Sequence, residues 1–320
     1  MGKNSEFEDD IAIACITMDD AKTIFFPLDT QKDVAIFGLL SNGMSLYITR
    51  TGSRFRNAFG ILCTSFLICN LQAIFSLSAW CIIVLTVKSQ KLSLPEFFFT
   101  RPVGIFVNGA YYGSLFVHFF VAVNRFCAFV YATKYNQLWS KSKAILVGVM
   151  SWVVGTTISM AHLYSDCSLT FNKNYSYRFS YSRSLAGKIC SNTDASITVI
   201  TVTSMACFDF TTLIKILAYQ RRMRANTITS TSEAVRARGI LFFRQSCILG
   251  VIYISYTFIL IIHPFTNKWV LFVSTTISWI LVQSLDGMTF LLFNHNLICK
   301  KNSGTTVTTA PVTNWIQTRQ

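Results

Sequence analysis

Residues 102–125 read PVGIFVNGAYYGSLFVHFFVAVNR, an apolar run that carries no formal charge until its last residue, Arg125. A helix needs about 20 mostly apolar residues to cross the hydrocarbon core of a bilayer, so this run predicts a membrane span. Within it, Tyr111, Ser114, His118 and Arg125 recur at i, i+3, i+7 and i+14. These spacings place the four side chains on one face of a helix. A polar face in a lipid-embedded helix is expected to look into a bundle of other spans.

Six further apolar runs flank this one, over residues 34–49, 57–87, 144–165, 195–214, 245–267 and 269–294. Charged residues make up 13% of the 320 residues and hydrophobic residues 52%. A soluble domain carries roughly 25% charged residues, so a water-covered globule is excluded. We predict an all-α membrane protein, a seven-transmembrane helix bundle over residues 33–300 with tails over 1–32 and 301–320.

The charge balance bears on partners and orientation. Lys and Arg number 28 against 14 Asp and Glu, a formal net charge of +14. In a chain this apolar, such an excess indicates basic loops beside anionic membrane lipid and no nucleic acid partner. More of these cations fall inside if the N-terminus lies outside, and Arg50 and Arg56 follow the first run. We therefore expect an extracellular N-terminal tail and a cytoplasmic C-terminal tail.

Four residues are candidates for covalent modification. Asn174 opens the Asn-X-Ser/Thr sequon Asn174-Tyr175-Ser176 on a predicted outer loop, where we expect it to carry a glycan. Cys167 and Cys190 lie on the same loop, and the oxidising environment outside favours a disulfide between them. Cys299, beside Lys300 and Lys301 just past the last run, is a candidate for palmitoylation.

The last run carries a second stripe. Trp279, Gln283, Asp286 and Phe290 recur at i, i+4, i+7 and i+11, and the fifth run carries a further acid, Asp209. A carboxylate buried in lipid is costly unless it is paired, hydrated or protonated. A structural hydrogen bond between helices and a functional role are both open for each acid. If the two shared a proton, they would act as an intramembrane aspartyl protease.

Motifs for other chemistry are missing from the sequence. It contains no His-Glu-X-X-His, Cys-X-X-Cys or Gly-X-Ser-X-Gly motif, no phosphate-binding Walker loop and no Gly-X-Gly-X-X-Gly. No Gly-X-Gly precedes either Asp209 or Asp286, which weakens the protease alternative. We expect no enzyme, no catalytic residue, no metal and no cofactor.

Several motifs together resemble a rhodopsin-like seven-helix receptor, and most of all the nematode serpentine chemoreceptors of class Srx. Asn124-Arg125-Phe126-Cys127-Ala128 is similar to that class's form of the Asp-Arg-Tyr motif, at the inner end of the third span. The resemblance covers about residues 33–300. It also rests on Trp152, Lys134-Tyr135-Asn136, RQSC at 244–247, PFTNKW at 264–269 and SLDGMTF at 284–290, the last resembling an Asn-Pro-X-X-Tyr motif.

The resemblance implies a chemosensory G-protein-coupled receptor in the plasma membrane, including that of a sensory cilium. Its partners would be a heterotrimeric G protein, membrane lipid and an unidentified small-molecule or peptide ligand. The coupling residues would be Asn124, Arg125 and, on a short third inner loop, Arg221 and Arg222. The activation switch would be Asp286, Gly287 and Phe290. The ligand pocket, in the outer half of the bundle, would include Tyr111, Ser204, Tyr256, Trp279 and Gln283.

Departures from the wider receptor pattern modify these expectations. Asn124 stands where such receptors carry an acid that pairs with the neighbouring arginine, so the sequence predicts a weakly restrained Arg125 and basal activity. Gly287 stands where proline is usual. A ligand-gated channel or transporter is the remaining alternative, but it would need a continuous polar pore, and the sequence offers two stripes in place of a ring.

Overall fold

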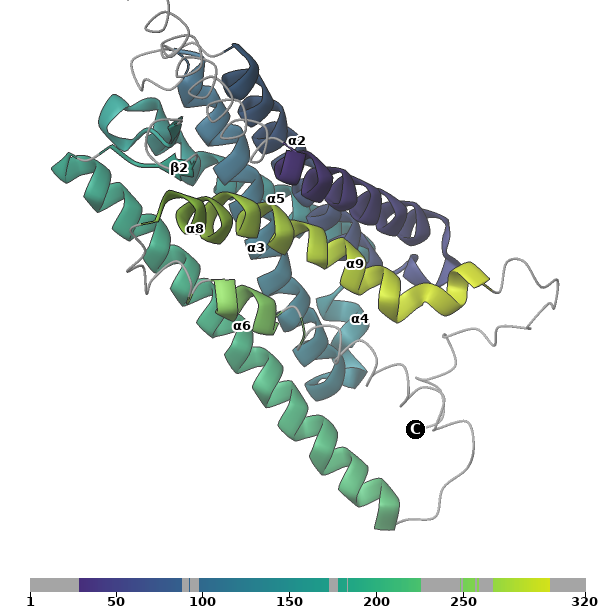
Figure 1. Cartoon of the computed structure of the whole chain (residues 1–320). Helices are drawn as coiled ribbons and strands as arrows, with labels where there is room; N and C mark the ends of the chain where they lie inside the picture. The colour runs from purple at the N-terminus through teal and green to yellow at the C-terminus, as the bar shows by residue number, and fades with distance from the viewer. Residues whose placement is uncertain are drawn as a thin grey trace, which may run out of the picture.

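The computed structural model in Figure 1 describes residues 29–87, 92, 98–172, 178–182, 184–225, 248, 250–256, 258 and 267–299. Helical segments cover residues 29–51 and 250–256. The other elements are η1 (Ser53–Phe55), α2 (Ala58–Val87), α3 (Thr100–Val130), η3 (Ala132–Lys134), α4 (Tyr135–Leu138), α5 (Lys141–Ser159), η4 (Met160–Leu163), η5 (Ser165–Cys167), β1 (Thr170–Asn172), β2 (Arg178–Ser180), α6 (Leu185–Ala225), α8 (Lys268–Phe272), the π-helical η6 (Val273–Ile277) and α9 (Ser278–Cys299).

Five helices of the described part are long and apolar enough to cross a membrane. They are Ala58–Val84, Thr100–Val130, Lys141–Leu163, Leu185–Ala218 and Val270–Asn294. They coincide with the second, third, fourth, fifth and seventh predicted runs. The first run lies within the helix over 29–51, and most of the sixth falls outside the described residues.

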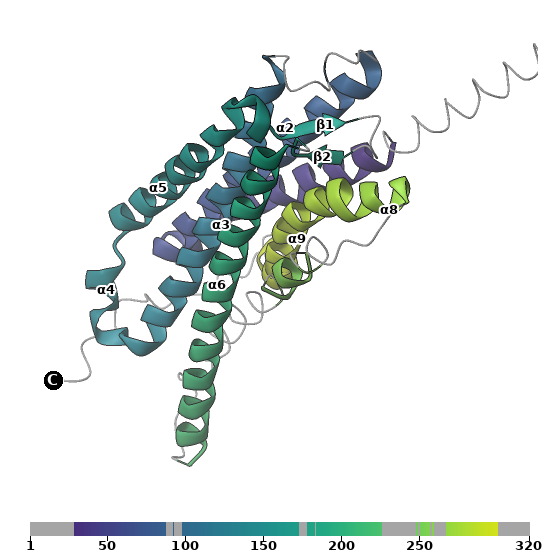
Figure 2. The same cartoon turned by 90° about the vertical axis from the view of Figure 1, so that its left-hand side faces the viewer.

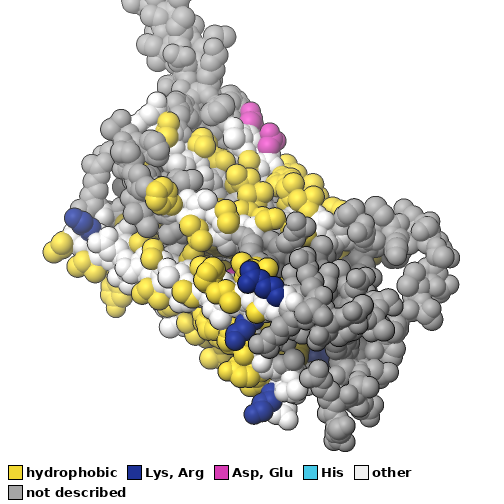
Figure 3. Space-filling model, turned by 90° about the horizontal axis from the view of Figure 1, so that it is seen from below, with side chains coloured by type: hydrophobic (Ala, Val, Ile, Leu, Met, Phe, Trp, Pro, Cys, Tyr) yellow, Lys and Arg dark blue, Asp and Glu magenta, His cyan; other side chains and the backbone are white. Residues whose placement is uncertain are grey.

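The helix over 29–51 has its polar and apolar faces reversed relative to a soluble protein. Ser41, Asn42 and Ser45 are buried, whereas its large apolar side chains are exposed: Ile36, Phe37, Leu40, Met44 and Tyr47. Figure 3 shows apolar side chains over much of the described part of one face of the molecule, with Lys and Arg confined to a few places. An apolar exterior around a polar interior is what a hydrocarbon solvent requires.

Small residues bring the helices close together at two contacts. Gly287 of α9 lies so near the helix over 29–51 that an added Cβ would meet the backbone N of Asn42 at 2.6 Å. In the same way, a Cβ on Gly155 of α5 would meet the backbone N of Gly113 in α3 at 2.7 Å. Without a hydrophobic driving force between helices in lipid, such close approaches supply packing energy. Figure 1 shows the helix over 29–51 lying alongside α9.

The two ends of the bundle differ, and both differ from the sequence-based expectation. At one end, called here the hairpin end, β1 and β2 pair antiparallel, with Phe171 opposite Phe179. The sequence analysis did not predict this hairpin. At the other end, called the Arg125 end, α6 runs well past its neighbours (Figure 2). The helix is 41 residues long and begins at Leu185, so it is much longer than the predicted run over 195–214.

Candidate functional site

A buried carboxylate joins three helical segments in the middle of the bundle. Oδ2 of Asp286 accepts hydrogen bonds from Asn70 Nδ2 at 2.9 Å and Tyr253 OH at 3.1 Å, and lies 3.0 Å from His118 Nε2. Asp286 is 0% exposed. We call these four residues the central cluster. The helical stripes of α3 and α9 therefore meet through polar contacts, as a polar face inside a bundle predicts.

Further contacts tie the central cluster to the backbone of its neighbours. Asn70 Oδ1 accepts from Ser114 Oγ at 2.6 Å, and Asn70 Nδ2 lies 3.3 Å from Asn42 Oδ1. Asn42 Nδ2 in turn donates to the carbonyl of Gln283 at 3.0 Å. Beside Gly287, Ser45 Oγ donates to that residue's carbonyl at 2.7 Å. The expected switch residues Asp286 and Gly287 thus lie in the most densely bonded part of the described structure, and Phe290 is buried one turn further along α9.

At the Arg125 end, the fourth residue of the α3 stripe forms an ion pair. Nη2 of Arg125 lies 3.3 Å from Oδ1 of Asp209 in α6, and the two side chains are 11% and 12% exposed. The expectation that Arg125 lacks an acidic partner is therefore wrong. The acid comes from a different helix, and no sequence neighbour of the arginine could have revealed it.

The two acids considered for a protease do not lie together. Asp286 contacts His118 and Asp209 contacts Arg125. His118 and Arg125 are two turns apart on α3, about 10 Å along the helix axis. The two carboxylates thus contact different basic side chains at different depths, and they do not form a dyad that shares one proton.

Asn124 has a structural contact next to Arg125. Its Nδ2 donates to the hydroxyl of Tyr135 at 3.1 Å, which fastens α4 to the end of α3. Burial raises the pKa of Tyr135, so this hydroxyl stays protonated. Arg221 is exposed in the last turns of α6 and Arg222 follows it in the same helix, where its side chain is outside the described part. These arginines therefore extend a helix and do not form the predicted short loop.

A cavity of about 850 Å³ opens at the hairpin end. It lies between α3, α6, β2, the end of the helical segment over 250–256 and the junction of η6 with α9. Trp279 packs edge-on against Tyr111 and Phe179, with ring centroids 5.8 and 6.2 Å apart. Thr275 and Thr276 of η6 reach the lining because the π-helical turn widens the helix there. The cavity wall therefore combines aromatic side chains with polar ones.

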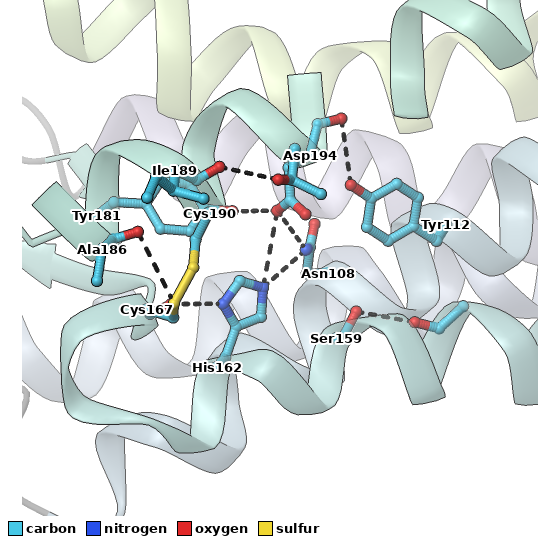
Figure 4. A network of polar contacts seen from close by, with 12 residues as sticks. Asn108, Tyr112, Ser159, His162, Cys167, Tyr181, Ala186, Ile189, Cys190 and Asp194 are labelled. Carbon is cyan, nitrogen blue, oxygen red and sulfur yellow. Dashed lines mark hydrogen bonds and ion pairs between the residues drawn. A yellow bond between two sulfur atoms is a disulfide. The ribbon is translucent and has the colours of Figure 1, made fainter. Parts of the chain in front are cut away.

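One acid of α6 gathers side chains from the surrounding elements beside this cavity (Figure 4). Oδ2 of Asp194 accepts from Asn108 Nδ2 at 3.0 Å and from the hydroxyl of Tyr181, and lies 3.8 Å from His162 Nε2. We call these four residues the Asp194 cluster. Asn108 Nδ2 also lies 2.8 Å from His162 Nε2, and the other ring nitrogen of His162 lies 2.8 Å from the carbonyl of Cys167.

The Asp194 cluster is tied to the hairpin end by covalent and electrostatic means. A disulfide joins Cys167 of η5 to Cys190 of α6, with their Cα atoms 5.7 Å apart. Burial, followed by the charge and hydrogen bond of Asp194, raises the pKa of Tyr181 above its usual value. The phenol therefore remains a hydrogen-bond donor to the carboxylate at any neutral pH.

Some of the pocket residues predicted from the sequence line the cavity and others do not. Of the five expected pocket residues, Tyr111, Tyr256 and Trp279 line it. Ser204 does not, and its hydroxyl donates to the carbonyl of Ile200 within the same helix. Gln283 lies one turn deeper and is 1% exposed, and neither side-chain atom has a hydrogen-bond partner among the described residues.

The Asp194 cluster was missed. Asn108 continues the α3 stripe one step beyond Tyr111, and that spacing was an available signal. Asp194 stood one residue before the predicted fifth run, so it was placed in a loop. Among the remaining candidates, Asn174 lies outside the described residues, and so does the side chain of Cys299. Within the described ranges, no three His, Cys, Asp or Glu side chains gather to hold a metal ion.

Known proteins match this chain over most of its length. Residues 33–294 match the family described as serpentine type 7TM GPCR chemoreceptor Srx. The chain is 21% identical over 202 residues to serpentine receptor class X 45 of Caenorhabditis elegans, covering 57% of this chain and 55% of the relative. It is 25% identical over 181 residues to serpentine receptor class X-43 of the same organism, covering 54% and 55%.

The chain spans about half the length of these curated relatives. The resemblance seen in the sequence and the predicted seven-helix membrane fold are confirmed by the family match, while the orientation of the N-terminus stays a prediction. The match over residues 33–294 shows that the chain belongs to the Srx family of serpentine seven-transmembrane chemoreceptors and is a multi-pass membrane protein.

Proposed function

We propose that the protein is a chemosensory G-protein-coupled receptor of the plasma membrane. Its ligand binds in the cavity at the hairpin end, which faces outward, and its Arg125 end faces a heterotrimeric G protein. One observation carries the proposal. A single helix, α3, lines the cavity with Asn108, Tyr111 and Tyr112 and, further along, holds Arg125 in the pair with Asp209.

The mechanism is a two-state equilibrium of the bundle. A ligand that contacts α3 and α6 at the hairpin end shifts the equilibrium only if it binds one arrangement of these helices better than the other. In the resting arrangement, Arg125 is held by Asp209 of α6. Separation of α3 from α6 at this end breaks the pair and presents the guanidinium to the G protein. Arg221 and Arg222, on the long end of α6, then border the docking site.

The test is G-protein nucleotide exchange in membranes at matched receptor density. Arg125→Ala should keep surface expression but lose ligand-evoked exchange by about tenfold or more, equivalent to a coupling free energy of at least ~1.4 kcal/mol. Arg125→Lys should recover little, because an ammonium cannot reproduce the planar five-donor fork of a guanidinium. Lys141→Ala is the matched control, since Lys141 is an exposed cation at the same end. Full exchange by Arg125→Ala would refute the proposed coupling role.

The proposed orientation has its own test. Asn174 would carry a glycan if the loop between α5 and α6 is extracellular, and Asn174→Gln should then lower the apparent mass on a gel after expression in animal cells. An epitope tag inserted in this loop should be reached by antibody on intact cells. A tag that is reached only after permeabilisation would show that the proposed topology is inverted.

A further inference from the structure

The cavity at the hairpin end has a chemical character that narrows the class of its ligand. Its aromatic lining residues are Tyr111, Tyr112, Phe179, Tyr181, Tyr256 and Trp279, and one carboxylate, that of Asp194, lies among them. A volume of about 850 Å³ is within the range of pockets for small molecules, roughly 300–1,000 Å³. The combination of a carboxylate with several aromatic faces is the one that proteins use for organic cations.

The carboxylate of Asp194 has one oxygen occupied and one available. The hydrogen bonds and ion pair that its side chain makes with Asn108, Tyr181 and His162 all fall on Oδ2. The Tyr112 hydroxyl, a further neighbour of this side chain, donates to the backbone carbonyl of Asp194 at 3.2 Å. The described residues offer no contact to Oδ1, and that atom is absent from the set of fully buried polar atoms without a partner. The side chain is 22% exposed and belongs to the cavity lining. Oδ1 is therefore a preoriented acceptor that a ligand can reach.

The charges around the cavity favour a cationic ligand over an anionic one. Lys188 also lines the cavity, but it is exposed on the first turns of α6, where water screens its ammonium. His162 is buried behind Asn108 and adds positive charge only if it is protonated. Asp194, in contrast, is held in place by fixed neighbours in a partly desolvated site, where an opposite charge is attracted more strongly than in water.

We propose that this cavity binds an organic amine with an apolar or aromatic body. The inference rests on the proposed function, because it names the ligand class of the same site. The ammonium donates a charge-assisted hydrogen bond to Oδ1 of Asp194. The body of the ligand packs against Trp279 and Tyr111, which line the cavity, and their aromatic rings also attract the cation.

The experiment measures thermal unfolding of the full-length receptor in lipid nanodiscs. The probes are 2-phenylethylamine and tryptamine, each compared with its neutral alcohol, 2-phenylethanol or tryptophol, and with indole-3-acetate as the anion. At saturating concentration an amine should raise the unfolding midpoint by about 2–4 °C, and the shift should saturate. The alcohols and the acid should bind at least about tenfold more weakly, because they lack the charge that Asp194 attracts.

Two variants locate the effect. Asp194→Asn should weaken amine affinity by about tenfold to a hundredfold and leave alcohol affinity nearly unchanged. Asp166→Asn is the matched control, because Asp166 is an exposed acid of η5 outside the cavity lining, and it should bind amines as the wild type does. If Asp194→Asn fails to fold, the ratio of amine to alcohol affinity in the wild-type protein decides the question.

The binding experiment can fail independently of the experiment that tests G-protein coupling. No shift with either amine, an equal shift with the alcohols, a larger shift with the acid, or unchanged amine binding by Asp194→Asn would each overturn the inference. Because unfolding is measured without a G protein, failure of coupling does not affect the result. A protein that binds amines but activates no G protein fails the proposed function alone, and one that signals without binding amines fails this inference alone.

Discussion

Asp286 and Asp209 are both acids buried within membrane spans, but their surroundings differ. Asp286 in the central cluster is contacted by Asn70, His118 and Tyr253, which come from three different helical segments. Asp209 forms an ion pair with Arg125 of a neighbouring helix. The central cluster lies deep in the bundle, whereas the Arg125–Asp209 pair lies near the end of α3, where both side chains keep some exposure.

This difference suggests that the central cluster is a fixed point of the bundle and that the Arg125–Asp209 pair is a contact that can break. Loss of Asp286 removes the buried acceptor that Asn70, His118 and Tyr253 share, so the bundle cannot rearrange there at low cost. Rupture of the Arg125–Asp209 pair leaves a guanidinium that can extend toward the headgroup region, which lowers the cost. We infer that the helices pivot about the central cluster and separate at the Arg125 end. The same physical chemistry thus gives two acids opposite roles.

The largest expected effect comes from the central cluster. Asp286→Ala should destabilise the protein by about 3–5 kcal/mol, because it removes the acceptor at the centre of a buried polar network. Asp286→Asn keeps the volume and one acceptor oxygen, so its cost should be smaller, about 1–2 kcal/mol. Thermal unfolding in nanodiscs measures both. Equal stability of Asp286→Ala and the wild type would remove the basis for calling the cluster a fixed point.

A smaller effect is expected when the cluster is disturbed without touching its side chains. Gly287→Ala places a Cβ against the backbone of Asn42, and backbone cannot move aside as a flexible side chain can. The helix over 29–51 must shift away from α9, at a cost of about 1–3 kcal/mol. Gly43→Ala is the matched control on that helix, because an added Cβ there meets nothing within 4 Å. The same unfolding assay compares the two variants, and equal stability would contradict the close helix contact.

The local patterns of the sequence were sufficient for the spans and for the inward polar faces. A charge-free run and a 3.6-residue period are properties of one helix, so they predicted α3 and α9 with the correct face toward the bundle. The residues that contact those faces come from other helices, and the spacing of residues within one helix does not specify them. For this reason Asp209 was not recognised as the partner of Arg125, and Asn124 was expected to leave the arginine weakly restrained.

Segment ends and the hairpin end were harder to predict for a related reason. Asp194 is contacted by His162 of η4, by Asn108 of α3 and by Tyr181, which follows β2. These contacts hold it within α6, although a charged residue at the end of an apolar run favours a loop. Ser204 was expected in the pocket from its depth in the fifth run, but it is not among the residues that line the cavity. Rotation about a helix axis is fixed by packing against neighbours, which the apolar run does not specify.

The smallest energetic effect bears most directly on the proposed signalling mechanism. Asp209→Asn removes the charge that holds Arg125 in the resting arrangement and nearly preserves the side-chain volume. A change of about 1 kcal/mol would raise the active-to-resting ratio roughly fivefold. The decisive measurement is basal G-protein nucleotide exchange, without added ligand, in membranes of matched receptor density. We predict a higher basal rate for Asp209→Asn than for the wild type, and loss of that increase in Asp209→Asn combined with Arg125→Ala. An unchanged basal rate in Asp209→Asn, or an increase that persists without Arg125, would contradict the role of the ion pair.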